Sequence, residues 1–407
     1  MNVASSEFVP LWRRPVVIVT AGCMIALITF GVRAGFGVFL APISADLGWG
    51  REVFAFAIAI QNLVWGAAQP VAGGIADRYG SGRVLAVGGI LYAAGVYLMS
   101  ISTSPLEMQM SAGVLIGLGL AGASFAVVLA AIGRAVAPER RSFALGLGTA
   151  AGSLGQFLLV PVGQGLLAEY GWTMALVLLS ILSLAIIPLA GALTGRPKAT
   201  PGEADQALGA ALREAGGHSS YMYLTAGFFV CGFQVVFIAI HLPAYITDIG
   251  LPAELGGYAL ALVGLFNVIG SIAAGYFGGR FSKKYLLTGI YLLRSVVIAA
   301  FVLAPPSATG VLLFSAAIGL LWLSTVPLTS GLVAQFFGVR YMATLFGIVF
   351  FSHQIGSFLG VWLGGYLFDA TGSYDIVWWI NVALGIGAAI LHWPIVERAV
   401  PRLARAT

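Results

Sequence analysis

The chain has 407 residues, of which 59% are hydrophobic and only 9% are charged, and its formal net charge is +5. A soluble globular domain carries about 25% charged residues, so a water-soluble fold of this length could not cover its surface with these charges. Lipid is therefore the expected outer solvent. The basic residues form no patch or tail, which argues against a nucleic-acid partner. The two cysteines, Cys23 and Cys231, lie in apolar runs and predict no structural disulfide.

Twelve apolar segments follow one another along the chain. Crossing a hydrocarbon layer of about 30 Å takes about 20 helical residues. Runs of that size centre near residues 29, 63, 93, 120, 153 and 183, and then near residues 234, 266, 293, 322, 354 and 386. The first run, from about Pro15 to Ile43, is too long for the core of a signal peptide and has no clear cleavage site. We expect it to be a membrane helix, because only helices satisfy their backbone groups at this length in lipid.

The charged residues test this count and orient the helices. If both termini are cytoplasmic, all 20 Lys and Arg residues except Arg33, Arg51 and Arg294 fall on the inner side. This bias is the positive-inside rule, and an error of one helix would scramble it. We therefore expect a multi-pass protein of a bacterial inner (plasma) membrane with both termini in the cytoplasm. The predicted domains are an N-terminal six-helix bundle (1–195), a cytoplasmic linker (196–219) and a C-terminal six-helix bundle (220–407).

The second half of the chain repeats the first at an offset of 201 or 202 residues. Gly48 meets Gly250, and Gly171 meets Gly372. Chance matches are easy among 55 glycines, but a constant offset across six segments is not. Two parallel repeats related by an axis along the membrane normal are a known build of secondary transporters. The expected fold is therefore all-α, with twelve transmembrane helices in two pseudo-symmetric six-helix bundles.

The loop between the second and third segments carries the most specific pattern. It reads Gly73-Gly-Ile-Ala-Asp77-Arg78-Tyr-Gly80-Ser-Gly-Arg83 and resembles the signature loop GxxxD(R/K)xGxx(R/K) of the major facilitator superfamily. The resemblance covers essentially the whole chain and implies transport by alternating access. It also implies that Gly73, Asp77, Arg78, Gly80 and Arg83 form a cytoplasmic latch, which would hold the two bundles together in the outward-facing state. The alternative is a tight charged loop set by topology alone.

Two arginines lie within predicted helices, where a charge is costly and marks a functional site by default. Arg33 lies in the middle of the first segment. Arg294 lies about ten residues into the ninth segment. Two roles are open for it: binding the substrate, or packing against backbone carbonyls. Every Asp and Glu maps to a loop or a helix end. Because an unpaired buried cation is destabilising and a guanidinium matches a carboxylate, the sequence predicts an anionic substrate.

Neutral polar and aromatic side chains accompany the arginines. Asn62, Trp65 and Gln69 share one helix face because they are spaced by three and four residues. Each polar side chain could equally bond one helix to another, and His353 could carry a proton or act as a neutral hydrogen bonder. The predicted substrate-binding residues are Arg33, Asn62, Trp65, Gln69, Gln156, Gln234, Asn267, Arg294, Trp322, Thr325, His353 and Gln354.

Within the superfamily, the first segment resembles the monocarboxylate porters, and its Pro42-Ile43 ending resembles the oxalate–formate exchanger group. The eighth segment departs from that group, because Phe266-Asn267-Val-Ile-Gly270 lacks both the arginine and the aspartate typical there. We expect a secondary transporter of a small organic anion, a monocarboxylate or similar carboxylate, with H+ or a counter-anion left open as a co-substrate. The alternative is multidrug or metabolite efflux on the same fold. No enzyme activity, metal or cofactor is expected, and a monomer is typical of the fold.

Overall fold

The computed structural model describes residues 14–136, 138–194, 208–337 and 342–401, and all the regular structure in these ranges is helical. In the first half of the chain the helices are α1 (Pro15–Ala34), α2 (Phe36–Leu47), α3 (Arg51–Tyr79), α4 (Ser81–Ser100), α5 (Pro105–Met108), the π-helix η2 (Gln109–Leu115), α6 (Ile116–Gly122), α7 (Phe125–Ala135), α8 (Pro138–Leu184) and α9 (Ile186–Ala192). In the second half they are α10 (Leu208–Gly216), α11 (Ser219–Asp248), α12 (Glu254–Gly278), α13 (Lys283–Leu303), α14 (Ala308–Leu321), α15 (Thr325–Phe337), α16 (Met342–Thr371) and α17 (Asp375–His392).

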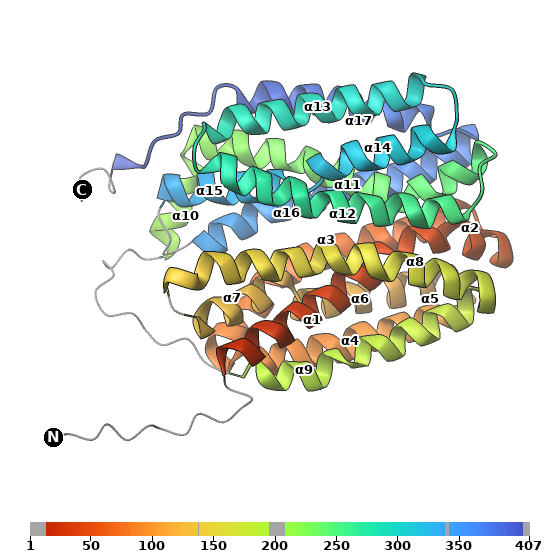
Figure 1. The fold of residues 1–407 in the computed structure, drawn as a ribbon, viewed down its shortest axis with the longest axis horizontal. Helices are drawn as coiled ribbons and strands as arrows, with labels where there is room; N and C mark the ends of the chain where they lie inside the picture. The colour runs from red at the N-terminus through yellow and green to blue at the C-terminus, as the bar shows by residue number, and fades with distance from the viewer. Residues whose placement is uncertain (1–13, 137, 195–207, 338–341, 402–407) are drawn as a thin grey trace.

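The number of membrane crossings agrees with the predicted twelve. Eleven helical spans among the described residues are long and apolar enough to cross a membrane. One of them, Ala150–Ala192, has 43 residues, which is enough for two crossings of about 20 residues each. Its helical backbone is interrupted at Gly171, with φ 72° and ψ 170°, and the chain turns back there (Figure 1). This span therefore holds the fifth and sixth predicted segments.

Glycines with positive φ support the predicted repeat. Gly48 and Gly250 have φ of 67° and 81°, and Gly171 and Gly372 both have 72°. A backbone in this region is readily adopted by glycine alone. The offset read from the sequence therefore places the same kind of turn at the same point of each half.

Helix crossings repeat as well. Gly155 on α8 packs against the carbonyl of Leu27 on α1, and Gly356 on α16 packs against the carbonyl of Phe229 on α11. A Cβ at either glycine would collide with the facing backbone. The helix pairs α1–α8 and α11–α16 therefore approach closely on repeat-related glycines, as small residues allow in membrane bundles.

The two halves lie side by side, with the red-to-yellow-green first half against the green-to-blue second half (Figure 1). The helices run along the long axis, with α2 and α5 at one end and α10 at the other (Figure 1). We call these the α5 end and the α10 end. In the predicted orientation the α10 end is cytoplasmic. The predicted domain boundaries stay a prediction, because half of the linker (196–207) lies outside the described residues.

Candidate substrate site

Arg33 lies in the last turn of α1, three residues before α2 begins at Phe36. Its half-buried guanidinium donates from Nη2 to Asn62 Oδ1 on α3 at 2.5 Å. The Asn62 amide nitrogen donates to the carbonyl of Ile58 at 2.8 Å, which points the amide oxygen toward Arg33. The guanidinium also lies 5.0 Å from the ring centroid of Trp65, a cation–π contact worth about 0.5–2 kcal/mol. One face of α3 therefore holds the cation in place.

Several polar atoms around Arg33 have no hydrogen-bond partner in the described part of the chain. Among the described residues, Arg33 Nε and Trp65 Nε1 are buried and donate to no acceptor, and Gln69 Oε1 accepts from no donor. Trp65 is only 6% exposed. An unsatisfied buried donor costs about 1–3 kcal/mol, and no described Asp or Glu bonds to Arg33. Both nitrogens therefore keep an unused hydrogen to donate.

The second half of the chain reaches this site through α16. Gln354 Nε2 donates to the carbonyl of Asn62 at 3.0 Å, and Gln354 Oε1 lies 3.1 Å from His353 Nδ1. The His353 ring stacks on Phe350, with centroids 5.4 Å apart and an interplanar angle of 9°. The structure therefore brings Arg33, Asn62, Gln354 and His353 together as one group from both halves, with Trp65 beside it.

Two other predicted residues lie at the seam between α8 and α12. Gln156 Nε2 donates to the carbonyl of Leu260 at 2.9 Å. Asn267 Nδ2 donates to Ser153 Oγ at 3.1 Å, and its Oδ1 accepts from the Leu323 amide at 3.1 Å. The amide nitrogen of each side chain is thus engaged within the protein, where it ties one half to the other.

Arg294 lies inside the second half, on α13, and is 1% exposed. Its Nε donates to the carbonyl of Leu321 at 3.1 Å, Nη2 donates to the carbonyls of Leu321 and Trp322, and Nη1 donates to Gln234 Oε1 at 3.4 Å. Leu321 ends α14 and Trp322 caps it. The last carbonyls of a helix lack intrahelical donors and carry the negative end of its dipole. The counter-charge of Arg294 is therefore a helix terminus.

The remaining predicted residues pack around Arg294. Trp322 is 4% exposed and Thr325 is fully buried. Thr325 Oγ1 lies 3.3 Å from the sulfur of Cys231, and Gln234 Nε2 donates to the carbonyl of Asn381 at 2.9 Å. The predicted site residues thus fall into three groups, and Arg33 belongs to a different one from Arg294.

The predicted latch is only partly described. The side chains of Asp77 and Arg78 lie outside the described residues. Gly80 separates α3 from α4 with φ 99°, which explains a glycine there. Gly73 faces open space and Arg83 is exposed. The latch stays a prediction.

An interlock that was not predicted joins the halves at the α5 end. Arg51, the first residue of α3, binds Asp248 at the end of α11 through two bonds, Nη1–Oδ2 at 2.5 Å and Nη2–Oδ1 at 2.7 Å. Asp369 on α16 accepts from the backbone nitrogens of Arg51 at 3.0 Å and Glu52 at 2.8 Å. The N-cap of α3 is Gly50, which has no side chain to offer. Asp369 therefore caps α3 from the other half of the chain.

Other groups complete this interlock. The guanidinium of Arg51 lies 4.0 Å from the centroid of Phe368 and donates to the Tyr374 hydroxyl at 3.1 Å. Burial raises the pKa of the Tyr374 phenol, so it stays neutral at physiological pH. Trp362 Nε1 donates to Glu52 Oε1 at 2.9 Å. Together these contacts between the two halves close the α5 end.

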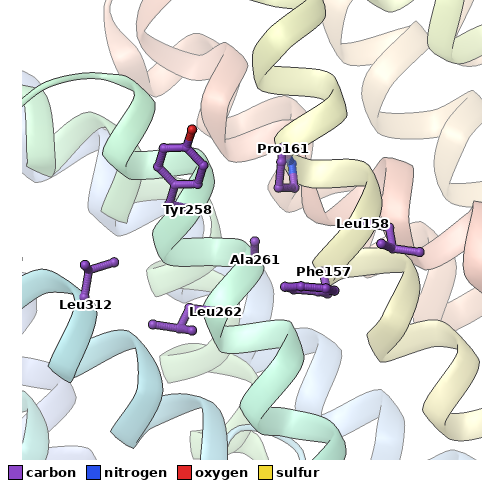
Figure 2. A pocket seen from close by; sticks show the side chains of 7 residues that line it. All are labelled: Phe157, Leu158, Pro161, Tyr258, Ala261, Leu262 and Leu312. Carbon is purple, nitrogen blue, oxygen red and sulfur yellow. The ribbon is translucent and has the colours of Figure 1, made fainter.

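One groove on the protein lies away from Arg33. It has a volume of about 500 Å³ and lies on the flank of the protein where α8 faces α12 and α14 (Figure 2). Its lining is Phe157, Leu158, Pro161, Tyr258, Ala261, Leu262 and Leu312. No charged side chain lines it, and several of its apolar side chains are exposed to the outside. This groove suits lipid contact and not an anion.

The family model described as Major Facilitator Superfamily matches residues 22–361. The chain belongs to the major facilitator superfamily. It is a multi-pass transmembrane transporter. It is 28% identical over 358 residues to monocarboxylate transporter 13 of Bos taurus, covering 85% of this chain and 81% of that protein. It is 27% identical over 406 residues to monocarboxylate transporter 11 of Mus musculus, covering 95% and 88%.

Bacterial proteins match as well. The uncharacterized MFS-type transporter YcxA of Bacillus subtilis (strain 168) is 24% identical over 379 residues, covering 90% of this chain and 91% of that protein. A bacterial homolog of the human lysosomal transporter Spinster, in an inward-facing conformation, has a TM-score of 0.77 at 14% identity, covering 94% and 97% of the two chains. The relatives named monocarboxylate transporters confirm the resemblance to that group within the superfamily.

Two sets of residues in this facilitator were not found from the sequence. Phe30 and Phe350 flank Trp65 with ring centroids at 6.2 and 5.4 Å, although Phe30 is three residues before Arg33 on the same helix face. The interlock at the α5 end was also missed. No local sequence pattern links Asp248 to Arg51.

Proposed function

We propose that this facilitator transports a small monocarboxylate, bound through its carboxylate at Arg33. The observation that carries the proposal is a half-buried cation with a free donor, beside the free Nε1 of Trp65. Arginine donates parallel hydrogen bonds that fit a carboxylate. Asn62 occupies only one of its nitrogens among the described residues.

Of the two arginines in the predicted site, Arg33 alone has a donor nitrogen without a partner among the described residues and so free for a ligand. We therefore expect the substrate to carry one negative charge. Arg294 is 1% exposed, and its three nitrogens already donate to two carbonyls and an amide oxygen. We infer that Arg294 stabilises the break between α14 and α15 and does not bind substrate. A dicarboxylate would then bury a second charge without a partner, which is strongly unfavourable. The curated relatives named monocarboxylate transporters support the same class.

The transport cycle follows from the closed α5 end. Under the orientation proposed from the charges, with both termini in the cytoplasm of a bacterial inner membrane, this state faces inward. Opening outward must break the Arg51–Asp248 pair and release the α3 cap from Asp369. We propose that the signature loop with Asp77 and Arg78 then closes the α10 end, in a monomer without cofactor or metal.

Uptake into proteoliposomes tests the proposal. Vesicles containing the full-length protein are given radiolabelled acetate, lactate and phenylacetate in turn, with the variant Arg33→Gln and the control Arg398→Gln, which removes an exposed charge. We expect Arg33→Gln to abolish carboxylate uptake and Arg398→Gln to leave it unchanged. Carboxylate uptake by Arg33→Gln at the wild-type rate would refute the role of Arg33.

A further inference from the structure

Aromatic rings from both halves of the protein cluster around Trp65, the ring that contacts the Arg33 cation. Trp65 on α3 meets Phe30 on α1 at 6.2 Å and Phe350 on α16 at 5.4 Å, both edge to face. Phe30 also meets Phe125 on α7 at 5.2 Å, with an interplanar angle of 77°. We call Phe30, Trp65, Phe125 and Phe350 the aromatic box.

The box is not a sealed core. Trp65 is 6% exposed, but Phe30, Phe125 and Phe350 are only partly buried. Arg33, which contacts the Trp65 ring, is partly buried as well. Partly exposed rings beside a partly exposed cation leave surface for a substrate that has an apolar body and one charged end.

Neutral polar groups near the cation are already engaged. Asn62 donates to Ile58 and accepts from Arg33. Gln354 donates to Asn62, and its oxygen lies beside His353. The side-chain atoms left without a partner on the Arg33–Trp65–Gln69 face are two donors and one acceptor, among the described residues. A substrate with several hydroxyl groups would lose its bonds to water here without replacing them.

Resting on the proposed function, we propose that the preferred substrate is a monocarboxylate with an aromatic body. Its carboxylate binds Arg33 and Trp65 Nε1, and its ring packs edge to face within the aromatic box. Phe350 belongs to the second half of the protein, so the bound ring contacts both halves. Small aliphatic acids and hydroxylated acids would keep the charge contact and lose the ring contacts.

The test is a binding series on the purified full-length protein, measured by calorimetry and by the thermal unfolding midpoint. The ligands are acetate, lactate, phenylacetate and the neutral isostere phenylacetamide. We expect phenylacetate to bind at least about tenfold more tightly than acetate or lactate, because burying the ring adds apolar and aromatic contacts. Phenylacetamide is expected to bind far more weakly than phenylacetate.

Two variants on α16 locate the ring. Phe350→Ala should weaken phenylacetate binding about tenfold and change acetate binding little. Phe358→Ala is the matched control, because Phe358 packs on Phe56 and Trp362 away from the box, and it should alter neither.

The outcomes separate this inference from the proposed function. Equal affinity for acetate, lactate and phenylacetate would overturn the aromatic preference and leave the carboxylate site intact. Phenylacetamide binding as tightly as phenylacetate would overturn the carboxylate site itself. A Phe350→Ala variant that weakens acetate as much as phenylacetate would assign Phe350 to general packing and also overturn the inference.

Discussion

Replacing Arg294 with leucine should destabilise the protein rather than alter its substrate. The side chain is 1% exposed and donates to the carbonyls of Leu321 and Trp322. Its removal leaves two buried carbonyls without donors, at about 1–3 kcal/mol each. The gain from no longer burying a cation offsets part of this cost, so we expect a loss of about 2–4 kcal/mol.

The assay is thermal unfolding of the purified protein together with binding of phenylacetate. On the scale of soluble domains of 150–250 residues, this loss lowers the midpoint by about 4–16 °C. Arg33→Gln is the contrast, because Arg33 is half-buried and makes one side-chain hydrogen bond among the described residues, so a much smaller shift is expected. An Arg294→Leu protein with an unchanged midpoint and no carboxylate binding would refute the structural role of Arg294 and make it a substrate ligand.

Three further changes test other parts of the site. Asp369→Ala removes the acceptor that caps α3, which weakens the closed α5 end by about 1–3 kcal/mol. A cysteine introduced at Ala55 should then react faster with a membrane-impermeant thiol reagent. The control Asp375→Ala should leave the reaction rate of that cysteine unchanged. His353→Gln should keep any pH dependence of uptake, because we expect His353 to act as a neutral partner of Gln354, and a lost pH dependence would make it the proton carrier. Arg33→Lys should keep weak uptake, since an ammonium lacks the paired donors of a guanidinium; full activity would show that a point charge suffices.

Much of the fold could be predicted because lipid imposes simple rules. Segment length, positive-inside bias and the 201–202 offset each depend on local composition, and the turn glycines at Gly48 and Gly250 follow the offset directly. The two crossings within the span Ala150–Ala192 were also predicted, although only a short turn at Gly171, with positive φ, separates them.

The site was harder to predict because the partners of its side chains are distant in sequence or lie on the backbone. Arg294 lacked a carboxylate in the sequence, and its counter-charge is the end of α14. Asp369 caps a helix that begins 318 residues earlier. Helix periodicity did predict that Asn62 and Trp65 share one face, and the structure puts that face against Arg33. It could not show that Phe350 would complete the site from the other half.

The anion site at Arg33 is tested most directly by the dissociation constants of monocarboxylates for the wild-type protein and for Arg33→Gln. We expect Arg33→Gln to weaken binding of acetate, lactate and phenylacetate alike by about tenfold to a hundredfold, because charge-assisted hydrogen bonds contribute about 1.5–3 kcal/mol. Its thermal unfolding midpoint should stay close to that of the wild type. If the dissociation constants of Arg33→Gln stay within about twofold of the wild-type values, the change is smaller than loss of such a bond allows. That result would contradict Arg33 as the anion site.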